Sequence, residues 1–252
     1  MRKIIFILSL SLIVVSCQQK QDHNLKIAVA ANMQFAIKEL AKKFTLQTGI
    51  KCDLIISSSG KLTAQIKEGA PFDIFISADM KYPTELYNAG FTAGKPKIYG
   101  YGKLVLWSMI DTLEPSIDIL KNSKIRHIAI ANPKTAPYGK ATIETLKHYG
   151  IYESVKDKLV YGESISQTNQ FIVSKSAGIG FTSKSVVLSP QIKEKGKWIA
   201  INETVHTSIS QGVIILKSNV VRKNEAKKFY DFISSIAARK ILRDFGYSVT
   251  SN

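Results

Sequence analysis

The sequence predicts an α/β protein of two domains, each built on a parallel sheet. Strand-like and helix-like segments alternate along almost the whole chain, and strands separated by helices of about 10 to 15 residues are typical of parallel sheets. Behind an N-terminal leader, roughly 230 residues remain, enough for two domains of about 100 to 150 residues each. The glycine-rich stretch Tyr99-Gly100-Tyr101-Gly102 indicates the end of the first domain.

In the first domain, short apolar runs alternate with amphipathic segments that end at a glycine. Phe35, Leu40 and Phe44 recur at helical spacing, and Gly49 follows them as a helix stop. The same pattern predicts strands at 25–30, 51–56 and 72–77, and helices at 33–47, 61–68 and 80–88.

The alternation continues through the second domain and returns to the first. We expect strands at 103–107, 127–131, 159–161, 179–182, 198–201 and 212–216, and helices at 116–121, 140–149 and 166–174, with a long broken helix at 223–245. A return near 208–212 places the C-terminal helices on the first domain. The predicted domains are therefore 25–101 with 209–252, and 102–208, joined by two crossings around a cleft that can close.

The first 17 residues form a targeting segment. Arg2 and Lys3 precede an apolar run, 4–15, that is too short to span a membrane. The run ends at Ser16-Cys17, which resembles the lipobox of bacterial lipoproteins, where the cysteine becomes lipidated and N-terminal. The prediction is a lipoprotein signal peptide at 1–17 and a polar tether at 18–24, which places the protein in the cell envelope on a lipid anchor. An ordinary signal peptide that contains a cysteine is the alternative.

Composition argues against metal, redox and hydrolytic chemistry. Cys52 is the one cysteine left in the folded part and lies in an apolar stretch, which favours a buried structural thiol. The four histidines are scattered without ligand spacing, and we find no Gly-x-Ser-x-Gly elbow. We predict no enzyme, no catalytic residue, no metal centre and no cofactor. The net charge of +16 suits an anionic partner, but the lysines form no basic stripe for nucleic acid; solubility alone could also explain the charge.

Four short loops join a predicted strand to a predicted helix through small or hydroxyl-bearing residues. A helix start exposes unpaired N–H groups at the positive end of its dipole, so it accepts an anion without a formal charge. Four such loops in one chain indicate a shared ligand, although asparagine and serine there could instead serve as helix caps. The loops are Ala30-Ala31-Asn32, 57–60, 136–139 and 162–166.

An ordered set of motifs resembles the periplasmic molybdate-binding proteins of ABC importers. The resemblance runs from about Leu25 to the C-terminus, and its long central block is the most specific part. The motifs are Ala30-Ala31-Asn32, Ser58-Ser59-Gly60-Lys61-Leu62, the block 65–79, Asn132-Pro133-Lys134-Thr135-Ala136-Pro137-Tyr138-Gly139 and the segment 162–168.

The resemblance implies a two-domain type II periplasmic-binding fold with the ligand in the interdomain cleft. It implies a monomer that captures molybdate or tungstate and delivers it to a permease with a separate ATPase subunit. By position, Asn32 and Ser59, with Ser58 beside it, supply donors from the first domain, and Tyr138 and Ile165 supply backbone N–H groups from the second. Some family members place a tyrosine where this chain has Ser183, which makes Ser183 a further candidate ligand.

Alternatives in other classes stay open at this point. Another oxyanion, sulfate or phosphate, could bind on the same architecture, and an envelope hydrolase is the rival of a different class. Lys61 and Lys140 each fall in the first turn of a predicted helix, where a positive charge opposes the dipole by about 0.3 to 1 kcal/mol. They could steer an anion towards the cleft, or be there by chance in a lysine-rich chain.

Overall fold

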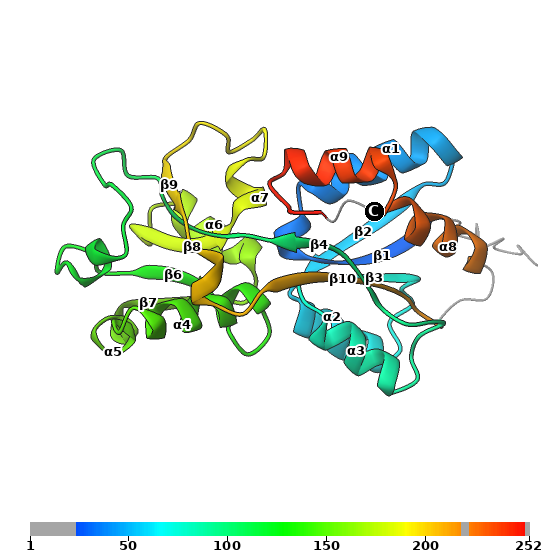
Figure 1. The fold of residues 1–252 in the computed structure, drawn as a ribbon, viewed down its shortest axis with the longest axis horizontal. Helices are drawn as coiled ribbons and strands as arrows, with labels where there is room; N and C mark the ends of the chain where they lie inside the picture. The colour runs from blue at the N-terminus through cyan, green and yellow to red at the C-terminus, as the bar shows by residue number, and fades with distance from the viewer. Residues whose placement is uncertain (1–23, 218–221, 250–252) are drawn as a thin grey trace, which may run out of the picture.

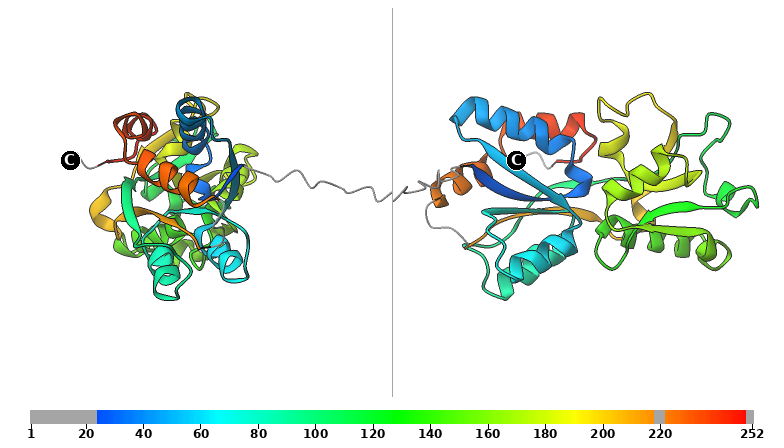
Figure 2. Two further views of the ribbon diagram at one scale, coloured as in Figure 1. Left: turned by 90° about the vertical axis from the view of Figure 1, so that its right-hand side faces the viewer. Right: turned by 180° about the vertical axis from the view of Figure 1, so that it is seen from behind.

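Two five-stranded sheets, one in each of two lobes, organise the computed structural model of this chain (Figure 1). The structure describes residues 24–217 and 222–249. The lobes lie side by side along the long axis, and the first lobe carries the start and the end of the described chain (Figures 1 and 2). The predicted signal peptide with Cys17, and all of the predicted tether except Asn24, lie outside the described residues.

The first sheet has the strand order β2-β1-β3-β10-β4 and is mixed. β1 runs parallel to β2 and β3, whereas β10 runs antiparallel to β3 and β4. The strands are β1 (Leu25–Ala30), β2 (Cys52–Ser57), β3 (Ile74–Ser77), β4 (Lys97–Gly102) and β10 (Ile209–Ile215).

The second sheet repeats this plan with the order β7-β6-β8-β5-β9. β6 is parallel to β7 and β8, and β5 is antiparallel to β8 and β9. The expectation of purely parallel sheets is therefore wrong. Its physical reason is the crossings: β10 and β5 each enter a lobe from the other one and so run against the strands that end at the cleft. The strands are β5 (Leu104–Ser108), β6 (Ile128–Ala131), β7 (Leu159–Gly162), β8 (Ile179–Ser183) and β9 (Lys197–Ala200).

Helices cover both faces of the first sheet (Figure 1). On one face, α1 and α9 pack together with α8, and the ring of Phe44 lies 5.0 Å from that of Phe229. The predicted C-terminal helix is indeed broken, since Ser235 accepts a hydrogen bond from the Ala238 N–H and caps a new helix. The helices are α1 (Ala36–Thr48), α2 (Ser59–Lys67), α3 (Lys81–Asn88), α8 (Lys223–Phe232) and α9 (Ile236–Asp244), preceded by the 3-10 turn η1 (Ala31–Met33).

The second lobe buries a continuous apolar core around Trp107 and Phe181. Helix α6 packs against β6, β7 and β8, and α4 contacts β6 and β8. Its helices are α4 (Pro137–His148), α5 (Tyr152–Val155), α6 (Ile165–Val173) and α7 (Lys184–Val187), with the 3-10 turns η2 (Asp118–Lys121), η3 (Lys156–Lys158) and η4 (Glu203–Val205).

The glycine-rich stretch that we expected to mark the domain end is strand β4, which the sequence pattern did not reveal. β4 pairs with β10 and leads through Lys103 directly into β5, so it is one of the two crossings. A Cβ at Gly102 would lie 2.1 Å from the Tyr138 hydroxyl, so glycine there permits a close contact with the second lobe. The glycines reflect close packing at the crossing rather than a loose linker.

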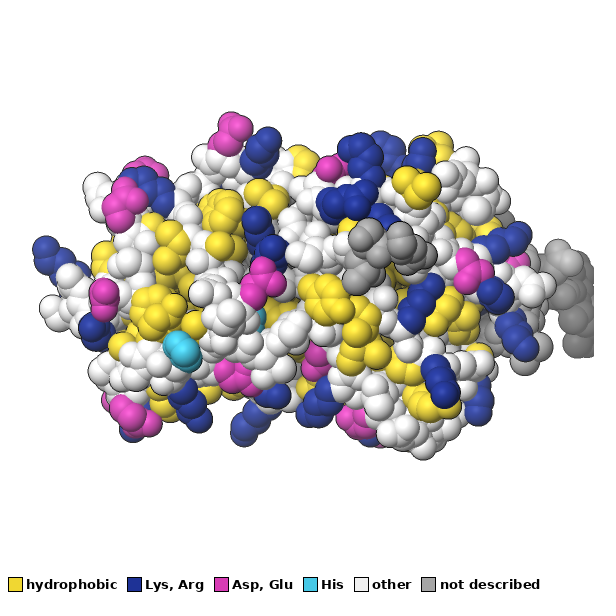
Figure 3. Space-filling view, in the orientation of Figure 1, with side chains coloured by type: hydrophobic (Ala, Val, Ile, Leu, Met, Phe, Trp, Pro, Cys, Tyr) yellow, Lys and Arg dark blue, Asp and Glu magenta, His cyan; other side chains and the backbone are white. Residues whose placement is uncertain are grey.

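Surface charge follows the sequence expectation, whereas Cys52, which was expected to be buried, is only half-buried on the edge strand β2. Lysine and arginine side chains are scattered over the visible face of both lobes and form no stripe there (Figure 3). Burial raises the pKa of the Cys52 thiol to about 12, so it stays protonated and unreactive at neutral pH. Within 24–217 and 222–249, no helix is long and apolar enough to cross a membrane.

Candidate functional site between the lobes

The four predicted loops meet at one small cavity between the lobes. Each lies at the carboxyl end of a strand: β1 and β2 in the first lobe, and β6 and β7 in the second. The cavity measures about 10 Å³, roughly the space of one water molecule. It is lined by Ala30, Ala31, Asn32, Ser58, Ser59, Ala78, Ala136, Pro137, Tyr138 and Ile165.

Helix starts supply this cavity with backbone donors from both sides. Ser59 begins α2, Ile165 begins α6, and Tyr138 is the first residue of α4 with an N–H because Pro137 has none. Within the described part of the chain, the backbone N–H groups of Asn32, Ser59, Tyr138 and Ile165 have no hydrogen-bond partner. Four donors of this kind can surround one small anion.

The two serines of the second loop have different roles. The Ser59 hydroxyl accepts a hydrogen bond from the Ala78 N–H at 3.0 Å, which leaves its own proton to donate into the cavity. The Ser58 hydroxyl instead accepts from the Lys61 N–H at 3.4 Å and caps α2. Ser59 is therefore the side-chain donor, and Ser58 holds the helix that presents it.

The Asn32 side chain does not offer its amide to the cavity. Its Nδ2 donates to Gln211 Oε1 at 2.8 Å and to the Tyr247 hydroxyl at 3.0 Å, so both amide protons have protein acceptors. The sequence reasoning missed Gln211 and Tyr247. A polar residue beside the buried run of β10 was the available signal for Gln211, whereas nothing in the sequence marks Tyr247.

Ser183 lies outside the cavity lining. Its hydroxyl is fully buried and 2.9 Å from that of Ser185, which in turn donates to the Asn32 carbonyl oxygen at 2.6 Å. Ser183 is thus linked to the first loop through Ser185 rather than directed into the cavity.

Uncharged side chains alone line the cavity. Burial raises the pKa of the Tyr138 hydroxyl well above its ordinary value, so it stays protonated and neutral. The nearby Lys61 is paired with Glu163 at 2.5 Å, so neither charge is directed into the cavity. The site can therefore hold an anion by hydrogen bonds and helix dipoles, without a formal countercharge.

Direct bonds between the lobes surround the cavity. The Gly60 N–H donates to Thr135 O at 2.9 Å, and the Tyr82 hydroxyl donates to Lys134 O at 3.2 Å. On the other side, the Ser166 hydroxyl donates to Gln34 Oε1 at 2.8 Å. These contacts define a closed arrangement of the two lobes.

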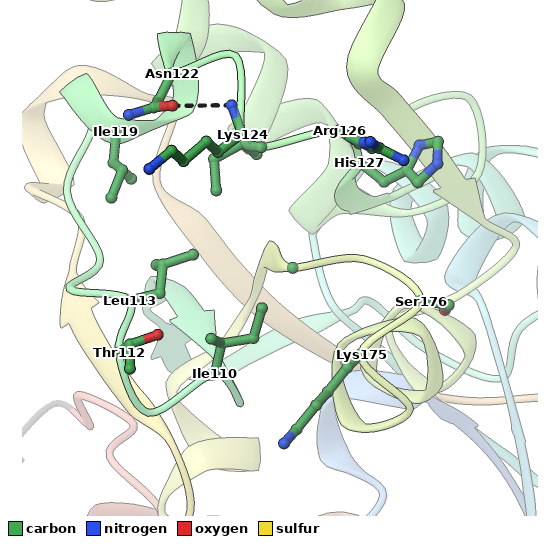
Figure 4. A pocket seen from close by; sticks show the side chains of 12 residues that line it. Ile110, Thr112, Leu113, Ile119, Asn122, Lys124, Arg126, His127, Lys175 and Ser176 are labelled. Atoms are coloured by element: carbon green, nitrogen blue, oxygen red, sulfur yellow. Dashed lines mark hydrogen bonds between the residues drawn. The ribbon is translucent and has the colours of Figure 1, made fainter.

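A larger hollow of about 490 Å³ lies at the far end of the second lobe (Figure 4). It is lined by apolar side chains, which include Ile110, Leu113 and Ile125, and by Lys124 and Arg126, which are both exposed. It is wide and partly apolar, unlike the small donor-lined cavity between the lobes. Within the described residues, no group of three His, Cys, Asp or Glu side chains could hold a metal ion.

Comparisons with known proteins agree with this geometry. Residues 25–248 match the family model described as bacterial extracellular solute-binding protein. The molybdate-binding protein ModA of Rhodobacter capsulatus is 36% identical over 221 residues, covering 87% of this chain and 86% of that protein. A putative ABC transporter substrate-binding lipoprotein of Bacillus subtilis, YvgL, is 27% identical over 258 residues, covering 97% of both.

A solved structure has the same fold. The periplasmic molybdate-binding protein of Azotobacter vinelandii superposes with a TM-score of 0.85 at 33% identity, covering 90% of this chain and 100% of that one. The two-domain type II binding-protein fold implied by the sequence resemblance is thereby confirmed.

Proposed function

The chain belongs to the family of bacterial extracellular solute-binding proteins, and from that premise we propose that it captures molybdate outside the cytoplasm for an ABC importer. It performs no chemistry. A permease with a separate ATPase subunit receives the anion. Molybdate and tungstate have nearly the same size and shape, so tungstate competes for the same site.

One observation carries the proposal: helix starts from two lobes direct free donors into one uncharged cavity. Ser59 from the first lobe and Tyr138 from the second lie on opposite sides of it. Because each lobe holds only part of the donor set, an anion completes its hydrogen bonds only when the lobes close. Binding and closure are therefore coupled.

The donor chemistry favours a fully deprotonated dianion. Phosphate at neutral pH usually keeps one proton and needs an acceptor to receive it, whereas the groups offered here are N–H and O–H donors. Molybdate, tungstate and sulfate all meet this requirement. Sulfate is smaller than the other two ions, so size is the property by which the site would distinguish it from them.

We propose specific roles for the candidate residues. Asn32, Ser59, Tyr138 and Ile165 bind the anion through their backbone N–H groups, and Ser59 adds its hydroxyl. Ser58 supports the site as the cap of α2. Ser183 makes no direct contact, because it is not part of the cavity lining.

We propose that two domains move relative to each other as rigid units. The first comprises residues 25–101 and 209–252, and the second comprises residues 102–208. The crossings through Lys103 and through 201–208 are the only peptide connections between these two parts, and each is short. Motion about two short crossings opens and closes the cleft as a hinge. The proposed binding unit is a monomer, because both lobes that line the cavity come from one chain.

We further propose that Cys17 carries a lipid anchor on the extracytoplasmic face of a membrane. The support is the leader that ends in Ser16-Cys17 and the similarity to a relative named a lipoprotein. Full-length protein with Cys17→Ser should leave the membrane fraction, whereas wild type should stay there until detergent is added. Equal partitioning of the two proteins would contradict the anchor.

Calorimetry tests the ligand. A protein of residues 18–252, which lacks Cys17, is stripped of bound anions and titrated with molybdate, tungstate, sulfate and phosphate. The expected result is a Kd below about 1 μM for the first two anions and no heat from the others. Tight binding of sulfate or phosphate would overturn the choice of ligand, and silence from all four would overturn the binding function.

A further inference from the structure

Gln211 lies where the returning strand meets the binding loops. It belongs to β10, at the bulge where the pairing with β4 shifts between Gln211 and Gly212, and its side chain is fully buried. Its Nε2 donates to Ala78 O at 3.1 Å and to Ile209 O at 3.2 Å. Both acceptors are backbone carbonyls, so the opposite orientation would press Oε1 against two oxygens. The orientation of this amide is fixed by the backbone.

The fixed amide of Gln211 dictates the orientation of Asn32. Gln211 Oε1 can only accept, and Asn32 Nδ2 meets it at 2.8 Å. The second Nδ2 proton goes to the Tyr247 hydroxyl at 3.0 Å. Asn32 Oδ1 therefore points away from Gln211, and this buried oxygen has no well-formed hydrogen bond within the described residues.

A second buried atom without a partner lies beside it. The Tyr138 hydroxyl comes from the second lobe, is buried, and has no well-formed hydrogen bond among the described residues. A Cβ built on Gly102 would meet both this hydroxyl and Gln211 Nε2, which places the hydroxyl next to the Gln211 amide. Burial raises the pKa of Tyr138, and the nearby Asn32 side chain lowers it by a smaller amount. The Asn32 side chain of the first lobe thus lies beside the Tyr138 hydroxyl of the second.

Gln211 also reaches the second loop of the site. The carbonyl of Ala78 accepts from Gln211 Nε2, and the N–H of the same residue donates to the Ser59 hydroxyl at 3.0 Å. One side chain therefore holds Asn32 directly and supports the Ser59 hydroxyl through Ala78.

We infer that Gln211 is a positioning residue of the anion site: it holds the Asn32 side chain, and with it the first loop, so that the Asn32 backbone N–H faces the anion. Asn32 then binds the anion through its backbone N–H alone. The inference rests on the proposed function. It adds that Gln211 links strand β10 to both binding loops of the first lobe, the one with Asn32 and the one with Ser59.

A double-variant cycle distinguishes a Gln211 that acts through Asn32 from a Gln211 that only stabilises the sheet. Molybdate affinity is measured by calorimetry for wild type, Gln211→Met, Asn32→Ala and the double variant. Each single change should weaken binding by about tenfold, the effect of one or two lost hydrogen bonds. The double variant should be little weaker than Asn32→Ala, because Gln211 acts through Asn32. If the double variant loses affinity by the product of the two single losses, the inference is wrong.

A second pair of variants keeps the test decisive if Gln211→Met does not fold. Tyr247→Phe removes the other acceptor of the Asn32 amide and should weaken binding by about fivefold in wild type but by less in Asn32→Ala, since the amide is already gone there. Tyr99→Phe is the matched control: Tyr99 also donates to Gln211 Oε1, at 3.3 Å, but does not orient the amide. Its expected effect is below about twofold.

The outcomes keep the two proposals apart. If the wild-type protein binds no molybdate, the proposed function is wrong. If the wild-type protein binds molybdate and Tyr247→Phe weakens binding equally in wild type and in Asn32→Ala, the positioning role alone is wrong.

Discussion

Lys61 and Glu163 join the two lobes at the edge of the anion cavity. The Lys61 ammonium, in the first turn of α2, lies 2.5 Å from the Glu163 carboxylate in the loop before α6. Both side chains are substantially exposed, at 43% and 66%. The pair therefore neutralises a lysine whose charge alone opposes the helix dipole, and it is formed only when the lobes are together.

Breaking this pair should weaken closure by a small, salt-dependent amount. Lys61→Gln should lower molybdate affinity by less than about fivefold at low ionic strength, because exposed ion pairs contribute about 0 to 1 kcal/mol. The difference should vanish in high salt. The check is titration at two salt concentrations, with Lys156→Gln as control because Lys156 pairs with Glu153 inside one lobe. A loss of molybdate affinity that persists in high salt would contradict an electrostatic contribution of the Lys61–Glu163 pair to closure.

Gly60→Ala should obstruct closure without harming the fold. A Cβ at Gly60 would lie 2.9 Å from Thr135 Cα on the opposite lobe, whose backbone cannot easily yield. We expect molybdate affinity to fall by about tenfold or more, in line with overpacking costs of about 1 to 3 kcal/mol. The melting temperature of the ligand-free protein should change little. Gly94→Ala is the matched control, since nothing lies within 4 Å of its Cβ; equal affinities for the two variants would refute the contact.

Ser59→Ala and Ser58→Ala should separate binding from stability. Loss of the Ser59 hydroxyl removes a donor to the anion and leaves the buried Ala78 N–H without its acceptor. Affinity should drop by about 10- to 100-fold. Ser58→Ala removes the α2 cap and should mainly cost about 1 kcal/mol of unfolding free energy. Calorimetry measures the affinity of both variants, and chemical denaturation measures their stability. A large loss of affinity in Ser58→Ala, with little loss in Ser59→Ala, would exclude these roles.

Asp73 should matter for stability alone. Its carboxylate is 2% exposed, accepts from Arg222 Nε at 2.8 Å, and accepts from the Lys26 N–H at 2.8 Å. Asp73→Ala should lower the unfolding free energy by about 1 to 3 kcal/mol, because it removes a buried carboxylate that accepts two hydrogen bonds. Molybdate affinity of the folded fraction should be unchanged, since Asp73 precedes β3 and the cavity lies beyond its other end.

An exposed carboxylate provides the control for Asp73. Asp231→Ala removes a pair with Lys227 that lies on the surface of α8 and should change stability by less than about 0.5 kcal/mol. Urea denaturation measures both. A binding defect in folded Asp73→Ala would mean that this end of β3 communicates with the site.

The four anion loops were predictable from sequence because each is a local feature. A strand followed by Ser59 or by Pro137-Tyr138 at a helix start is written in consecutive residues, and exposed N–H groups follow from helix geometry itself. The same holds for the elements that end at Gly49 or Gly150, both of which have positive φ. The ordered set of motifs indicated the family, with block 65–79 as its most specific part, yet Asp73 in that block serves the core of the fold rather than the anion.

The sequence by itself determined the alternation of strands and helices, the helix starts and the chemistry of their donors, since these depend on neighbours in the chain. Only the tertiary structure decided that β4 is a strand, that both sheets are mixed, and that the Asn32 amide faces Gln211 instead of the ligand. Asn32 and Gln211 are separated by 179 positions, and a hydrogen bond over that separation has no local signature. Which polar groups remain free to bind is settled by long-range pairing, because most buried donors are paired with acceptors that the fold brings to them.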